Sequence, residues 1–212
     1  MNKAGSPGGV GNAAIASATA IALCGGAWLL HSAAGSDAPP QPSAAQASTD
    51  ADRERSAAPA LPPSPPDRIR IPAIRVDAPL MGLGLTTAGN LDVPPAEQKN
   101  LAGWYESGTT PGDTGTAIVA GHVDNTRGPA VFYDLGALTK GSTIEVDRRD
   151  GSTAVFTVYA VEVYGAKDFP DDKVYGAAKH PELRVITCGG GYSKPTGYQG
   201  NVVVFAHLTG SR

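Results

Sequence analysis

Short apolar runs, separated by glycine and proline, make up the sequence from residue 67 onward, and this pattern limits the fold more than any other feature. Residues that favour strands are concentrated at 68–71, 76–80, 116–120, 143–147, 154–163, 183–188 and 201–208. The chain contains 27 glycines and 18 prolines, a composition that suits strands and tight turns better than a helical bundle. The pattern therefore predicts an all-β domain, either a closed barrel or a sandwich.

Two local signals refine this prediction. Asp150 and Gly151 lie between two strand-like runs, a pairing typical of a β-hairpin turn. Residues 129–138 carry Val131, Phe132 and Leu135 at a spacing that leaves room for one short helix. We expect one or two short helices in an otherwise all-β domain.

An uncharged apolar run near the N-terminus predicts a membrane anchor. Residues 10–30 are mostly Ala, Ile, Leu and Gly, and at about 1.5 Å per residue a helix of this length spans roughly 30 Å, one hydrocarbon core. Lys3 precedes the run and Asp37 follows it, so residues 1–9 are expected in the cytoplasm and the rest of the chain outside the cell. The competing interpretation is a cleaved signal peptide with small residues at 32–34.

Residues 31–66 are rich in Ala, Pro and Ser, which cannot bury a core, and we expect a disordered stalk. Residues 67–212 then form the globular domain. The formal net charge of the chain is −3 and no basic stripe is present, which argues against nucleic acid as a partner.

Cys188 is the single cysteine of this domain, since Cys24 lies in the apolar run. Outside the cytoplasm cysteines are normally paired, so an unpaired thiol is either incidental or a nucleophile. A thiol nucleophile needs a proton carrier, and histidine suits that role near neutral pH. His122 follows one predicted strand as Cys188 ends another, so the two side chains are expected to open onto one cleft. The alternatives are a buried, inert thiol and a structural histidine.

These motifs resemble those of the sortases, and the nearest group is class E/F of Gram-positive bacteria. The resemblance rests on residues 120–124 (Ala-Gly-His-Val-Asp) and 186–190 (Ile-Thr-Cys-Gly-Gly), supported by 69–72 and 102–105. It implies a membrane-anchored cysteine transpeptidase with an eight-stranded barrel and no cofactor. The implied substrate is a C-terminal sorting signal of the Leu-Pro-x-Thr-Gly kind, cut between Thr and Gly, and the implied acceptor is a cell-wall amine. By the same resemblance, Cys188 is the nucleophile and His122 the general acid/base.

One position departs from the family. Sortases usually carry an arginine just before the last strand, where this chain has Gln199. A neutral amide still donates hydrogen bonds but without the charge of a guanidinium. Either Gln199 serves as a weaker donor, or Arg127, five residues after His122, reaches the site; a solvated loop charge is the other interpretation of Arg127.

Other candidates are weaker. The amides of Gly189, Gly190 and Gly191 could support an oxyanion or form a plain turn, and Asp124 could orient His122 or cap a turn. The acidic residues 168, 171 and 172 are interpreted as a solvated loop, and no cluster has metal-ligand spacing.

Two alternative functions remain at this stage. Because of Gln199, the domain could be a sortase-like protein that binds sorting-signal or wall peptides without cleaving them. An L,D-transpeptidase also uses Cys and His outside the cell, but its Ser-x-Gly-Cys-x-Arg motif is absent from the sequence.

Overall fold

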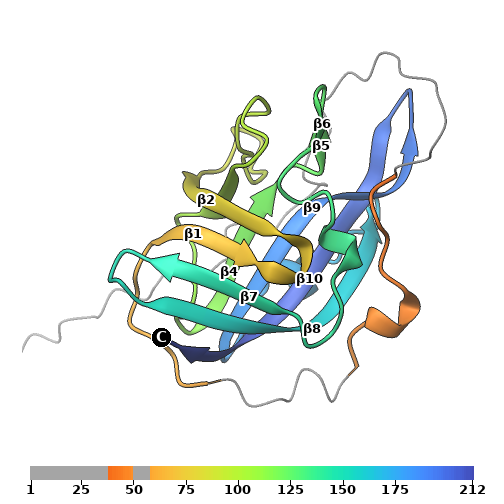
Figure 1. Ribbon diagram of the computed structural model, residues 1–212. Helices are drawn as coiled ribbons and strands as arrows, with labels where there is room; N and C mark the ends of the chain where they lie inside the picture. The colour runs from red at the N-terminus through yellow and green to blue at the C-terminus, as the bar shows by residue number, and fades with distance from the viewer. Residues whose placement is uncertain (1–37, 50–57) are drawn as a thin grey trace, which may run out of the picture.

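The computed structural model describes residues 38–49 and 58–212 (Figure 1). The predicted cytoplasmic segment and membrane anchor lie outside these residues. No helix within the described ranges is both long and apolar enough to cross a bilayer.

Eight strands close into a barrel, as the resemblance implies. In spatial order they are β1 (Pro66–Ile71), β2 (Val76–Leu83), β3 (Ala102–Tyr105), β4 (Gly115–Gly121), β9 (Pro181–Ser193), β10 (Gly197–Ser211), β8 (Thr153–Gly165) and β7 (Thr143–Arg148). Most neighbours are antiparallel, but β2 with β3 and β4 with β9 are parallel. The predicted all-β barrel is confirmed.

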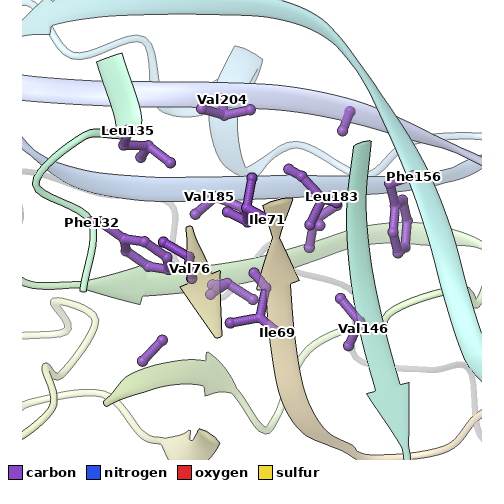
Figure 2. Close-up of a cluster of buried hydrophobic side chains, with 14 of the residues drawn as sticks. Ile69, Ile71, Val76, Phe132, Leu135, Val146, Phe156, Leu183, Val185 and Val204 are labelled. Carbon is purple, nitrogen blue, oxygen red and sulfur yellow. The ribbon is translucent and has the colours of Figure 1, made fainter. Parts of the chain in front are cut away.

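The barrel interior is filled by side chains from alternate positions of its strands (Figure 2). Leu183 and Val185 of β9 and Val204 of β10 point inward and pack with Ile69 and Phe156, all fully buried. Because side chains of a strand alternate between its two faces, the intervening residues of β9 and β10 lie on the outer face. That alternation places Cys188 outside the barrel wall.

A second apolar cluster covers this outer face of β9 and β10. Ile186, Val203 and Phe205 pack there under the connection between β8 and β9. This connection contains the short helix α2 (Asp171–Tyr175), whose Val174 and Tyr175 are buried against the sheet. Of the acidic residues 168, 171 and 172, interpreted from sequence as a solvated loop, Asp168 and Asp172 are exposed, while the apolar residues that follow them pack on the barrel.

The predicted hairpin is present, with Gly151 at a φ of 86° between the paired strands β7 and β8. The predicted helix at 129–138 is reduced to a 3-10 turn, η4 (Leu135–Ala137), because the preceding residues fold back onto the end of β4. The amide of Phe132 donates to the carbonyl of His122 at 3.0 Å in that return. Further 3-10 turns are η2 (Ala44–Gln46) and η3 (Pro72–Ile74), and β5 (Asp124–Asn125) pairs with β6 (Gly128–Pro129).

Part of the predicted stalk lies on the barrel. The amides of Ala58 and Leu61 donate to the carbonyls of Leu208 and Gly112, each at 2.8 Å, and Ser64 is buried. The ordered domain therefore begins before residue 67, because the side chain of Leu61 packs on the interior core and backbone groups of the segment find partners there.

Residues 38–49, drawn in orange in Figure 1, run along the side of the barrel from beside the β9–β10 hairpin toward β8. The amide of Ser48 donates to Glu162 of β8 at 2.7 Å, and η2 contacts the same strand. The side chain of Gln41 accepts a hydrogen bond from the amide of Gly190 at 3.2 Å. Residues 31–37 and 50–57 of the predicted stalk lie outside the described residues.

Candidate active site

The parallel pair β4 and β9 brings Cys188 and His122 to the same place. The last paired residues of the two strands are Ala120 and Ile186, and His122 and Cys188 each lie two residues further along. Ala120 and Ile186 lie on the outer face, on neighbouring backbones about 4.8 Å apart, and Cys188 follows Ile186 on that face. His122 lies just beyond the end of β4, at the same end of the ladder. The hydroxyl of Thr187 donates to the carbonyl of Gly121 at 2.8 Å and ties the strands together at this point.

Cys188 lies inside β9 rather than at its end, where the sequence analysis expected it. The ladder with β4 stops at Ile186, but β9 continues to Ser193 because β10 pairs with it over the glycine triplet. The extended pair forms the blue hairpin that projects from the barrel in Figure 1. The thiol is 2% exposed, is not in a disulfide, and packs within the outer cluster.

A backbone carbonyl orients the ring of His122. Its Nε2 lies 2.7 Å from the carbonyl oxygen of Pro94. A carbonyl only accepts, so Nε2 carries the proton, and in the neutral ring Nδ1 is left as the acceptor. His122 is 9% exposed, and its own carbonyl accepts from Phe132. The imidazole is thus held by contacts on both its side chain and its backbone.

The residues that follow His122 also bind the segment 94–97, which contains Pro94. Asn125 donates from Nδ2 to the carbonyl of Ala96 at 2.7 Å, and Arg127 donates from Nη2 to the carbonyl of Glu97 at 2.6 Å. Together with the contact at Pro94, three side chains after β4 bind carbonyls of the segment 94–97. The guanidinium of Arg127 is exposed on this loop, as the interpretation of a solvated loop charge has it, and it also binds the carbonyl of Glu97.

Asp124 and Tyr198 form the next link across the site. The hydroxyl of Tyr198 donates to Oδ2 of Asp124 at 2.6 Å. Burial raises the pKa of Asp124 above its usual value, although the Tyr198 hydrogen bond and the charge of His122 act in the opposite direction. Burial and the bond to Asp124 raise the pKa of Tyr198 far above its ordinary value, and the charge of nearby Cys188 contributes. Tyr198 therefore stays neutral and donates.

Gln199 lies in a bulge of β10, between Tyr198, which pairs with Tyr192, and Gly200, which pairs with Gly189. Its carbonyl accepts from the amide of Ala166 at 2.9 Å, and its side chain is exposed. A Cβ placed on Gly191 would lie 3.3 Å from Oε1 of Gln199. The amide of Gln199 thus lies over the hairpin, above the third glycine.

Comparison with known proteins agrees with this geometry. The family model for the sortase domain matches residues 69–209. The chain belongs to the sortase family. It is accordingly a cysteine transpeptidase.

Several solved sortases share the fold of this sortase. Sortase A from Listeria monocytogenes is 19% identical with a TM-score of 0.53, covering 70% of this chain and 90% of its own. Sortase A from Corynebacterium diphtheriae is 20% identical with a TM-score of 0.52, covering 69% and 62% respectively. The sortase D5 transpeptidase from Clostridium perfringens is 21% identical with a TM-score of 0.51, covering 69% and 79%. No curated protein matches the chain.

Three supporting residues of this sortase were not found from sequence. Thr187 was only part of a motif, Tyr198 only marked the position before Gln199, and Pro94 has no distinguishing signal in the sequence. Thr187 could have been singled out, because a hydroxyl in an otherwise apolar run needs a partner once it is buried. Within the described ranges, no group of three or more His, Cys, Asp and Glu side chains could hold a metal ion.

Proposed function

We propose that this sortase, of the class E/F type, cleaves a Leu-Pro-x-Thr-Gly-like C-terminal sorting signal between Thr and Gly and transfers the acyl group to a cell-wall amine. The observation that carries the proposal is the shared register of Cys188 and His122, two residues beyond the last rung between β4 and β9. The class assignment rests on the motifs at 120–124 and 186–190.

The reaction follows from the two groups. The sulfur of Cys188, as the thiolate, attacks the threonyl carbonyl carbon, and a new carbon–sulfur bond replaces the bond to the glycine nitrogen. His122 gives a proton to the departing glycine amine. An incoming amine then attacks the thioester, passes its proton to His122 and releases the thiolate.

The bond between His122 and Pro94 is compatible with both halves of this cycle. When the ring is protonated, both nitrogens donate, so Nε2 keeps its carbonyl partner while Nδ1 supplies the transferred proton. The ring need not turn to exchange that proton. We infer that Pro94 holds His122 in one orientation throughout turnover.

The site works outside the cell in this proposal. Residues 10–30 are proposed to anchor the chain by a single membrane span, with residues 1–9 in the cytoplasm. The domain then meets exported proteins that carry a sorting signal. Fractionation of cells expressing the full chain, followed by protease treatment of intact cells, tests this orientation.

The decisive experiment is detection of the acyl-enzyme intermediate by mass spectrometry. Wild-type protein incubated with a Leu-Pro-Ala-Thr-Gly peptide should gain the mass of the acyl fragment on Cys188, and an added amine should discharge it. Cys188→Ala should remove both reactions while the thermal melting curve stays that of a folded domain. Cleavage by the Cys188→Ala variant at the wild-type rate would contradict the proposal.

The exposed position of Gln199 favours one second candidate, a sortase domain that binds such peptides without cleaving them. This candidate predicts peptide binding with no thioester. A mass increase on Cys188 eliminates it.

A further inference from the structure

Asn201 is the direct neighbour of Cys188 across the β9–β10 ladder. The two residues are paired in register, and on its other side Asn201 is paired with Tyr164 of β8. Residues directly opposite each other in an antiparallel pair project from the same face of the sheet. The side chain of Asn201 therefore lies on the outer face, between the thiol and the ring of Tyr164.

The position is polar where its neighbours are apolar. Val203 and Phe205, which follow on the same face of β10, belong to the outer cluster with Cys188. Asn201 is 2% exposed, and its Oδ1 has no hydrogen-bond partner among the residues that the structure describes. A buried acceptor without a partner costs about 1–3 kcal/mol. An apolar residue at this position would avoid that cost.

The missing partner is best supplied by a peptide. An extended substrate presents a backbone N–H next to every carbonyl, so a chain that offers its scissile carbonyl to Cys188 also brings an N–H beside it. The side-chain amide of Gln199 is exposed over Gly191 and that of Asn125 donates to Ala96, whereas Asn201 is buried directly opposite Cys188.

We propose that Asn201 is a substrate-binding residue whose Oδ1 accepts a backbone N–H adjoining the scissile carbonyl and so holds the peptide against Cys188. This inference rests on the proposed function. It gives Asn201 the role of an acceptor toward the substrate, distinct from the donor role considered for position 199.

The test compares two reagents that alkylate the same sulfur. Acetyl-Leu-Pro-Ala-Thr chloromethyl ketone needs the peptide contacts, and iodoacetamide does not; each forms a carbon–sulfur bond and releases halide. The ratio of their second-order rate constants at one pH cancels the thiolate fraction, and so isolates peptide binding. Asn201→Ala should lower this ratio about 5- to 100-fold, the range expected for losing one hydrogen bond to a buried acceptor. Asn201→Asp, which keeps an acceptor, should retain the ratio within about threefold, and Gln199→Ala serves as the matched amide control.

Melting temperature separates this role from a structural one. Oδ1 has no partner among the described residues, so Asn201→Ala should melt at the wild-type temperature or above it. If the Asn201 amide were structural, its removal would lower the melting temperature. An unchanged ratio in Asn201→Ala overturns the inference. It is also overturned if Asn201→Ala and Asn201→Asp lose the ratio to the same extent and both melt at a lower temperature than wild type. If the wild-type protein reacts with the peptide chloromethyl ketone no faster than with iodoacetamide, the proposed sorting-signal substrate is wrong, and this inference is wrong with it.

Discussion

The hydroxyl of Tyr198 donates to the carboxylate of Asp124 across 2.6 Å and so joins β10 to the hairpin that follows His122. Each partner has an electrostatic link to the proposed catalytic pair, Asp124 to His122 and Tyr198 to Cys188. This hydrogen bond therefore connects a neighbour of the general acid/base, Asp124, with a neighbour of the nucleophile, Tyr198.

Removing this hydroxyl should move the acid limb of the activity profile. The hydrogen bond from Tyr198 lowers the pKa of Asp124 against the effect of burial, so Tyr198→Phe raises that pKa further. Because the charge of Asp124 interacts with His122, a site that needs this carboxylate ionised shows an acid limb of kcat/KM that shifts to higher pH in Tyr198→Phe. The measurement is a pH profile of peptide cleavage. Asp124→Asn is the control, because it cannot ionise there; a limb that moves equally when Tyr198→Phe is added to Asp124→Asn contradicts the assignment.

The hydroxyl of Thr187 should matter for both stability and reactivity. Thr187→Val leaves the carbonyl of Gly121 without its buried partner, which should cost about 1–3 kcal/mol in the free energy of unfolding. It should also slow the acylation of Cys188 by peptide, since β4 and β9 lose their tie beside the thiol. Urea denaturation and single-turnover acylation measure the two effects.

The other end of β4 provides the matched control. Thr116 donates from its hydroxyl to the carbonyl of Gly176 at 2.8 Å and is fully buried. Thr116→Val should lose comparable stability yet acylate at the wild-type rate. Equal slowing in both variants would show that the effect comes from general destabilisation.

The clamp on the segment 94–97 should affect turnover less than His122 itself. His122→Ala should lower kcat by about 100- to 10,000-fold, the usual contribution of a general acid/base. Arg127→Ala should lower it only a few fold and should expose the segment 94–97 to faster hydrogen exchange, because the contact from Nη2 to the Glu97 carbonyl is lost. A loss with Arg127→Ala as large as that with His122→Ala would restore Arg127 as a catalytic donor.

Glu162 should make the packing of residues 38–49 depend on pH. Burial alone would raise the pKa of this carboxyl, but hydrogen bonds from Lys173, Ser48 and Tyr164 lower it to about 2. A depressed carboxyl pKa stabilises the fold above the unfolded pKa of 4.5 and loses that contribution as pH falls toward 2. Glu162→Gln should cost about 1.5–3 kcal/mol of unfolding free energy at pH 7. The difference from wild type should shrink below pH 4.5 in denaturation series, and a difference that is constant with pH contradicts this account.

The local pattern was sufficient to predict an all-β domain, because β-branched runs separated by glycine and proline are typical of strands and turns. The choice of a barrel over a sandwich came from the resemblance to sortases. The placement of Cys188 and His122 at one end of the β4–β9 ladder was expected from their positions after two predicted strands, whereas the extension of β9 beyond Cys188 was not. This extension depends on pairing with β10 across the glycine triplet, and a run of glycines is more typical of a turn than of a strand.

The roles of Arg127, Tyr198 and Asn201 depended on tertiary contacts. Arg127 lies close to His122 in sequence, yet its guanidinium binds a loop carbonyl that no local pattern links to it. Asn201 did carry a signal, because it is the polar residue that opens the run Val-Val-Val at 202–204. Only the structure shows that Asn201 pairs with Cys188, which makes it a candidate for contact with the substrate.

The bond between Thr187 and Gly121 closes a chain segment of 66 residues, and the two strands it joins run in parallel. Contacts between residues so distant in sequence tend to form late, after the intervening hairpin of β7 and β8 is available. A chain interrupted before β9 contains the imidazole without the sulfur. In an intact chain the sulfur and the imidazole come to one end of a shared ladder only once β9 has paired with β4, so assembly of the site depends on one of the longest-range contacts of the fold.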